Sequence, residues 1–117
     1  MNNFYIFLKK LEKRLEQSTR IREKNEGKIP VIVEKGKHAE NLKEVDTLKL
    51  ILPPQSHIAD LLQVVQQKVV TKEYQQIYLK VGKEVPAPKI ALSDIYEKKK
   101  DEDGFLYVTY EAETPMG

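Results

Sequence analysis

The stretch KDEDGFLYVTY, residues 100–110, decides how the rest of the chain is organised. Its second half, Phe105 to Tyr110, is rich in aromatic and β-branched residues, which is the composition of a buried strand. Residues 111–117 show no apolar periodicity and end in a glycine. The sequence therefore predicts a buried strand followed by a flexible tail. It also suggests that the terminal carboxylate of Gly117 is the reactive group.

The size and composition of the chain exclude several classes of protein. Its 117 residues suit one compact domain and are too few for two domains with separate cores. Without cysteine it can hold no disulfide framework, thiolate metal site or cysteine nucleophile, and this fits a reducing compartment. Even the apolar run Leu48 to Leu52 is interrupted by Lys49. We therefore expect no membrane span or signal peptide, and any membrane contact to come from lipidation or a surface helix.

The order of apolar patterns and breakers predicts an α+β fold. Apolar residues at helical spacing from residue 4 to 18 predict one helix of about 20 residues, or two short helices broken near Lys9 and Lys10. Strands are predicted at 28–34, 48–52, 77–81 and 105–110, a main helix at 58–69 capped by Ser56, and a short helix near 92–96. This is the order of a ubiquitin-like β-grasp. We divide the chain into an N-terminal helical extension (1–27), a β-grasp core (28–110) and a flexible tail (111–117).

Residues that commonly perform catalysis or bind metals are few. His38 and His57 lack ligand spacing, and the adjacent acids of 101–103 are typical of a solvated turn rather than an acid–base pair. The glycines form no phosphate-binding loop. We therefore expect no enzymatic activity, no metal and no cofactor.

Positive charge gathers at the N-terminus. Residues 1–28 hold eight Lys or Arg against four Glu, whereas the remainder holds 12 against 14 acidic residues. A solvated helix face is one interpretation. The alternative is a docking surface for an acidic or cytoskeletal partner or an anionic lipid surface. Nucleic acid is not an expected partner, because the aromatic residues match no RNA-binding motif.

Four blocks of sequence carry a resemblance to a known family: RIRE at 20–23, KIPVI at 28–32, KLILP at 49–53 and KDEDGFLY at 100–107. In the same order, and over nearly the whole chain, they resemble the autophagy ubiquitin-like modifiers. The animal members of this family are microtubule-associated protein light chain 3 and the gamma-aminobutyrate receptor-associated protein. The resemblance implies a β-grasp preceded by two N-terminal helices, in a protein that is not an enzyme.

The resemblance also implies covalent attachment to a lipid. Gly117 would be activated as a thioester and transferred to the amine of phosphatidylethanolamine. Its partners would be an activating enzyme, a conjugating enzyme, a deconjugating cysteine protease and microtubules. The protein would be cytoplasmic, and autophagosomal when lipidated. The alternative is a ubiquitin-like scaffold that is never conjugated.

Finally, the resemblance implies that aromatic-x-x-aliphatic peptides of autophagy receptors and adaptors add a strand to the edge of strand 48–52. By family position, the aromatic pocket comprises Ile21, Pro30, Ile32, Lys49, Ile51 and Phe105. The aliphatic pocket comprises Leu50, Leu52, Pro53, Leu61, Val64 and Val65, with Lys28 and Lys68 as further contact positions. Strand alternation turns Lys49 and Ile51 to one side and Leu50 and Leu52 to the other. The alternative for Phe105, Ile32, Val64 and Val65 is a purely structural place in the core.

The sequence departs from the family pattern at four places. Thr47 replaces a lysine at the aromatic pocket, Gln17 replaces an acid beside it, and Gln66-Gln67 replaces arginines. Pro115-Met116 replaces the usual Thr-aromatic pair before the terminal glycine. The lost charges predict altered partner choice, and the stiff Pro115 predicts altered handling by a maturation protease.

Overall fold

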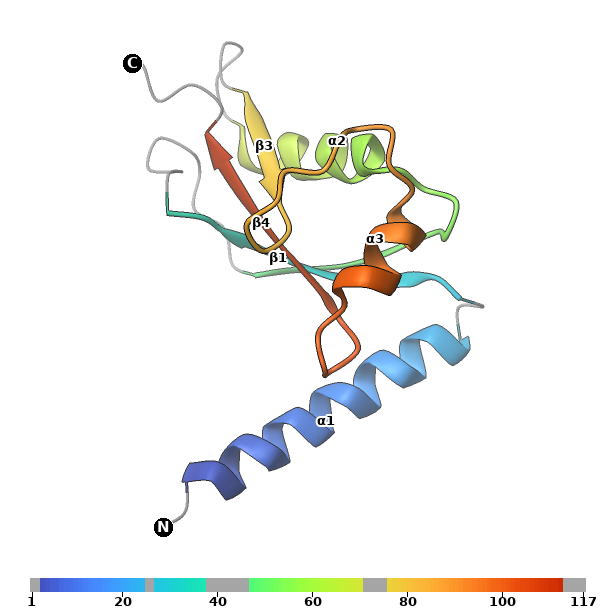
Figure 1. The fold of residues 1–117 in the computed structure, drawn as a ribbon, viewed down its shortest axis with the longest axis vertical. Helices are drawn as coiled ribbons and strands as arrows, with labels where there is room; N and C mark the ends of the chain where they lie inside the picture. Colours follow the sequence, from blue (N-terminus) through green and yellow to red (C-terminus); the bar gives the residue numbers. More distant parts are fainter. Residues whose placement is uncertain (1–2, 25–26, 38–46, 71–75, 113–117) are drawn as a thin grey trace.

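The computed structural model describes residues 3–24, 27–37, 47–70 and 76–112, with the side chains of the first helix described from Leu8 onward. In chain order its elements are α1 (Asn3–Lys24), β1 (Ile29–Lys35), β2 (Leu48–Leu52), α2 (Ile58–Val69), β3 (Ile77–Lys80), α3 (Leu92–Lys99) and β4 (Leu106–Ala112). The α+β class and the order of elements predicted from the sequence are confirmed (Figure 1).

The strands form one mixed sheet in the order β2-β1-β4-β3. The two central strands, β1 and β4, run parallel, whereas β2 pairs antiparallel with β1 and β3 pairs antiparallel with β4. This order places β2 at one edge of the described sheet, with a single strand neighbour.

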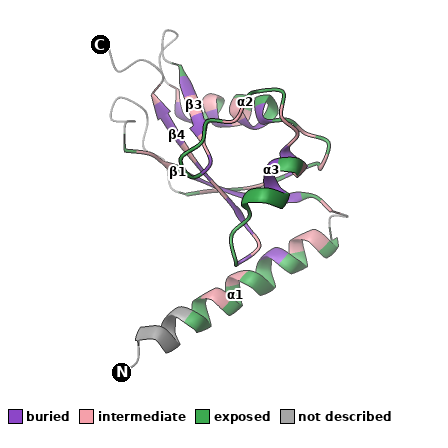
Figure 2. Cartoon of the chain, in the orientation of Figure 1, coloured by how far each residue is buried: buried purple, intermediate pink, exposed green. Residues whose placement is uncertain are grey.

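Both faces of the sheet are covered, but unequally. Ile29, Val31 and Val33 alternate along β1 and pack in the main core with buried residues of α2 and α3. The intervening residues Pro30 and Ile32 are also buried, and strand alternation turns them toward the opposite face, where α1 lies (Figures 1 and 2). The helix α1 is thus a separate layer on a sheet whose other face holds the main core.

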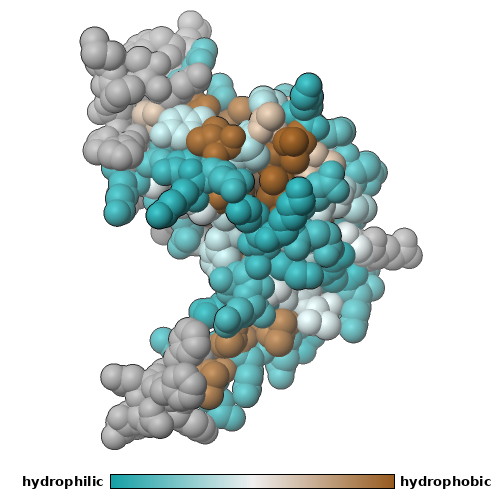
Figure 3. Space-filling model, viewed as in Figure 1, coloured by the Kyte–Doolittle hydropathy of each residue, from teal (hydrophilic) through white to brown (hydrophobic). Residues whose placement is uncertain are grey.

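Helix α1 is continuous from Asn3 to Lys24, with no break near Lys9 or Lys10. The two N-terminal helices implied by the family resemblance are therefore wrong for this chain. The reason is local, because residues 4–24 contain neither proline nor glycine. Leu8 and Leu15, two members of the predicted apolar stripe, are exposed, and Figure 3 shows apolar surface among the charged residues of this helix.

Helix α2 begins one residue later than its predicted cap would place it. The N-cap is His57 rather than Ser56. The backbone N–H of His57 donates to Oδ2 of Asp60 at 2.8 Å, which satisfies a donor that the helix leaves unpaired. His57 is therefore a structural cap residue, while His38 lies outside the described residues.

Strand β4 runs to Ala112, two residues past the predicted end of the strand. Glu111 is 2% exposed, and its Oε2 lies 3.4 Å from Nζ of Lys80 on β3. Its side chain also lies over Gly36, where a Cβ would overlap it. The first two residues of the predicted tail therefore belong to the sheet. Gly117 and the rest of 113–117 lie outside the described residues.

None of the described helices is long and apolar enough to cross a membrane. The described parts of the chain also contain no group of three or more His, Cys, Asp or Glu side chains that could hold a metal ion.

Candidate functional site

A cavity of about 340 Å³ lies between α1 and the edge strand β2. Three parts of the chain that are distant in sequence form its lining. These are Gln17, Arg20, Ile21 and Lys24 from α1, Lys49, Leu50 and Ile51 from β2, and Phe105 just before β4. The cavity therefore exists only because α1 is packed against the sheet.

The cavity combines an apolar floor with a positively charged rim. Phe105 is buried, Ile21 is half-buried, and Ile51 is 46% exposed. Arg20, Lys24 and Lys49 are exposed cations, and the described lining residues include no carboxylate. Such a site favours a ligand with an apolar side chain next to negative charge.

Alternation along β2 produces this arrangement. Lys49 and Ile51 are exposed, whereas Leu48 and Leu50 are half-buried and pack against the main core. On β1, the partners of Lys49 and Ile51 are Ile32 and Pro30, which are buried on the same face of the sheet. Ile32 and Pro30 thus support the cavity from beneath.

The outer edge of β2 adjoins the cavity. Since β1 is its only strand neighbour in the described sheet, the outward backbone groups of β2 can pair with an added strand. An extended peptide bound there would place alternate side chains toward Lys49 and Ile51. The apolar cavity and the strand edge therefore form one continuous surface.

A buried carboxylate network holds α1 near this surface. Asp103 is fully buried, and its Oδ1 accepts a hydrogen bond from the backbone N–H of Phe105 at 2.9 Å. Its Oδ2 accepts from the hydroxyl of Tyr107 and lies 3.0 Å from Nε of Arg14 on α1. The sequence interpretation of 101–103 as a solvated turn is therefore wrong for Asp103, because α1 covers it.

The backbone carbonyl of Asp103 and the adjacent Gly104, in the same turn, also lie against α1. The hydroxyl of Ser18 donates to the backbone carbonyl of Asp103 at 2.6 Å. Gly104, at φ 86°, makes this approach possible, because a Cβ there would fall onto the Ser18 hydroxyl. The hydroxyl of Tyr96 donates to the carbonyl of Gly104 at 2.6 Å, so α3 is joined to the same turn.

The network also affects an ionisable group. Burial of the Tyr107 hydroxyl raises its pKa, and the hydrogen bond to the Asp103 carboxylate raises it further. Together they hold the pKa far above the ordinary value of tyrosine. Tyr107 therefore keeps its proton, and can donate it to Asp103, up to a higher pH than an exposed tyrosine would.

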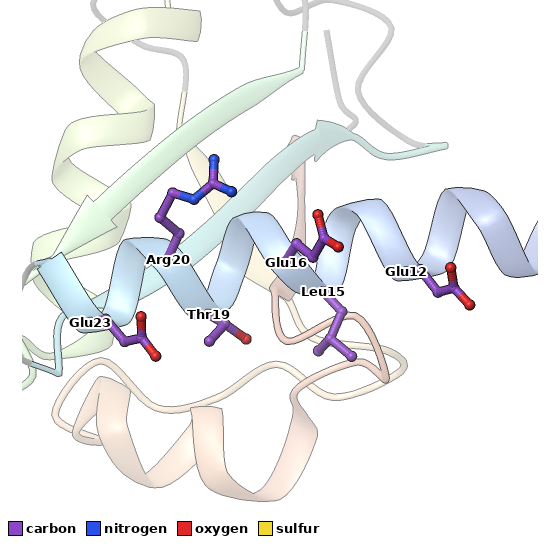
Figure 4. A pocket seen from close by; sticks show the side chains of 6 residues that line it. All are labelled: Glu12, Leu15, Glu16, Thr19, Arg20 and Glu23. Carbon is purple, nitrogen blue, oxygen red and sulfur yellow. The ribbon is translucent and has the colours of Figure 1, made fainter.

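All the described lining residues of a second cavity, of about 530 Å³, belong to α1. Figure 4 shows its residues along one side of the helix: Glu12, Leu15, Glu16, Thr19, Arg20 and Glu23. It adjoins no strand edge among these residues, and three carboxylates flank it. Arg20 lines both cavities, but the described lining residues of this one include three carboxylates, whereas those of the cavity beside β2 include none.

Comparison with known proteins identifies the family. The profile described as "Autophagy protein Atg8 ubiquitin like" matches residues 13–117. Autophagy-related protein 8A of Oryza sativa subsp. indica is 38% identical over 107 residues, which cover 92% of this chain and 89% of that protein. The chain belongs to the Atg8 family. Autophagy-related protein 8a of Arabidopsis thaliana is 37% identical over 107 residues, covering 92% and 87% of the two chains.

Solved structures of Atg8 proteins share the fold. The crystal structure of Trypanosoma brucei ATG8 superposes with a TM-score of 0.82 at 28% identity, covering 92% of this chain and 91% of that one. Plasmodium falciparum Atg8 in complex with a P. falciparum Atg3 peptide superposes with a TM-score of 0.76, also at 28% identity, covering 87% and 92%. As an Atg8-family protein, the chain is a ubiquitin-like modifier and not an enzyme.

In this Atg8-family chain, the predicted aromatic pocket is partly assembled. Ile21, Lys49, Ile51 and Phe105 line the cavity together, whereas Pro30 and Ile32 lie buried in β1. Leu50, assigned to the aliphatic pocket, is found in this lining instead. Lys28, Lys68 and Pro53 are exposed, and none of them is among its lining residues.

The residues of the predicted aliphatic pocket are mostly covered in the free chain. Leu52, Leu61 and Val65 are buried members of the main core, because that face of β2 and α2 packs inward. Val64 is only half-buried. In the free chain Leu52, Leu61 and Val65 therefore belong to the core, and their assignment to an aliphatic pocket stays a prediction.

Sequence reasoning missed two cations of the site. Arg20 and Lys24 line the cavity together with Ile21, and Gln17 was noted only as a departure beside it. A usable signal was present, since residues 17, 20, 21 and 24 follow the i, i+3, i+4, i+7 spacing of one helix face. Thr47 is exposed just before β2 and is not among the lining residues.

Proposed function

We propose that this chain is a ubiquitin-like modifier conjugated through Gly117 to phosphatidylethanolamine. In this role it acts in autophagosome formation and recruits cargo and adaptors by binding aromatic-x-x-aliphatic peptides. Its location is the cytoplasm, and the autophagosomal membrane once lipidated. Its further partners are the activating and conjugating enzymes and a deconjugating cysteine protease.

The observation that carries the proposal is the cavity between α1 and the edge of β2. An added peptide strand would gain main-chain hydrogen bonds from β2, and its aromatic side chain would enter the space between Ile21, Ile51 and Phe105. Acidic residues beside the aromatic residue would meet Arg20, Lys24 and Lys49. Apolar burial gives affinity, while the charged rim increases the rate of association and gives specificity.

Family membership and the sequence of the tail support conjugation. A terminal glycine has no Cβ, so a thiolate or an amine can approach its carboxyl carbon in a narrow active site. The last described residues of β4 are fixed in the sheet, and residues 113–117, which include Gly117, come next in the sequence. The alternative, a scaffold that is never conjugated, predicts the same peptide binding with a dispensable Gly117.

A titration followed by NMR tests the peptide-binding part. An acidic peptide containing an aromatic-x-x-aliphatic motif should perturb the backbone amides from Lys49 to Leu52 together with those of α1 residues 17–24. The same peptide with its aromatic residue replaced by alanine should cause much smaller shifts. Perturbation confined to residues 9–24 would instead indicate an acidic-partner site on the N-terminal helix.

A further inference from the structure

Helix α1 supplies half of the cavity lining, so the shape of the site depends on where this helix lies. Gln17, Ile21 and Lys24 face the cavity from one stripe of α1. A neighbouring stripe, Arg14, Ser18 and Arg22, recurs every four residues and contacts the rest of the fold. One side of α1 is therefore an attachment surface and the adjacent side is a binding surface.

The attachment surface meets the segment that precedes β4. Nε of Arg14 lies 3.0 Å from Oδ2 of Asp103, and the Ser18 hydroxyl donates to the Asp103 carbonyl at 2.6 Å. One turn further along, the guanidinium of Arg22 lies 4.6 Å from the centre of the Tyr96 ring, a cation–π distance. Two of these three contacts converge on Asp103.

Asp103 also fixes the floor of the cavity. Its Oδ1 accepts the backbone N–H of Phe105, the residue at the cavity floor, at 2.9 Å. One buried carboxylate thus contacts the helix that forms one wall and the backbone of the residue that forms the floor. Because the carboxylate is fully buried, losing a partner is costly, and this favours a single arrangement of the α1 wall relative to the floor.

We propose that Arg14 and Asp103 are positioning residues for peptide recognition. They hold α1 at the separation from β2 that the apolar side chain of the peptide requires, although Arg14 is not among the cavity's lining residues. The inference rests on the proposed peptide binding and adds to it a specificity determinant remote from the ligand. It predicts that peptide affinity and the attachment of α1 change together.

The test uses Arg14→Ala, whose side chain is 40% exposed in the folded chain, so the variant should fold. The matched control is Lys13→Ala, which removes the same charge from an exposed neighbour on α1. Calorimetry with the acidic peptide should show affinity about fivefold weaker for Arg14→Ala and little changed for Lys13→Ala. Arg14→Lys, which keeps the cation, should recover part of the loss.

Two readouts separate positioning from a general loss of stability. Hydrogen exchange should become faster for the amides of α1 in Arg14→Ala and stay unchanged in β1 and β4. In a double-mutant cycle, Ile21→Ala should weaken binding less in the Arg14→Ala background than in the wild type, because Ile21 is then no longer held against β2.

Equal affinity of Arg14→Ala and wild type would overturn the inference and leave the proposed function standing. An equal loss in Lys13→Ala, or an unchanged effect of Ile21→Ala in the cycle, would also overturn it. Failure of the wild-type chain to bind the peptide would overturn both.

Discussion

Ile51 offers the sharpest test of the cavity at the β2 edge. Its side chain is 46% exposed in the free chain, so about half of it remains to be buried by a ligand. Full burial of an isoleucine contributes roughly 1.5–3 kcal/mol, so the remaining half is worth about 1 kcal/mol, or about fivefold in Kd. Ile51→Ala should therefore weaken peptide binding about fivefold in a calorimetric titration.

The control for this substitution is Val85→Ala. Val85 is 57% exposed in the turn region between β3 and α3, and it is not among the cavity's lining residues. Val85→Ala removes a comparable exposed apolar side chain without altering the proposed site, so peptide binding should remain as in wild type. Unchanged binding by Ile51→Ala, or an equal loss in Val85→Ala, would refute the assignment of the cavity.

Two further predictions concern the turn that holds α1, which contains Gly104 and precedes Tyr107; Gly82, outside this turn, serves as the control for Gly104. Gly82 and Gly104 both have positive φ, so Gly82→Ala should cost about 1 kcal/mol of unfolding free energy from backbone strain alone. Gly104→Ala should cost more in urea unfolding, because its Cβ also meets Ser18; equal losses would argue against a close approach of α1. The raised pKa of Tyr107 stabilises the fold below pH 10.0, the ordinary pKa of tyrosine, and this contribution is lost as the pH rises above it. Wild type should therefore lose more stability than Tyr107→Phe between about pH 9 and pH 11, and equal losses would contradict the raised pKa that burial and the hydrogen bond to Asp103 give Tyr107.

Local patterns were enough to predict most of the sheet. Strand β2 was predicted to the residue, because Pro53 stops it and its lysine and leucine residues alternate. The same alternation predicted that Lys49 and Ile51 lie on one side and Leu50 and Leu52 on the other, and the structure shows the first pair exposed and the second more buried. Strand β4 was predicted too short, since Glu111 looks like a tail residue until Lys80 and Gly36 are brought beside it.

The burial of several residues could not be predicted from local sequence patterns, because it depends on contacts between distant segments. Asp103 lies in an acidic run that is typical of a solvated turn, and only its cover by Arg14 and Ser18 makes it a buried anchor. In the same way, nothing local distinguishes Leu52 or Leu61 in a pocket wall from the same residue in the core. The tertiary packing of α2 on the sheet decides this.

Conjugation through the terminal glycine is the central claim of the proposed function. The chain should be incubated with the autophagy activating and conjugating enzymes, ATP and liposomes containing phosphatidylethanolamine, and examined by gel electrophoresis. We predict a faster-migrating lipidated band for wild type and for the control Thr114→Ala, and no such band for Gly117→Ala. A band that persists in Gly117→Ala, or that never forms with wild type, would contradict the claim.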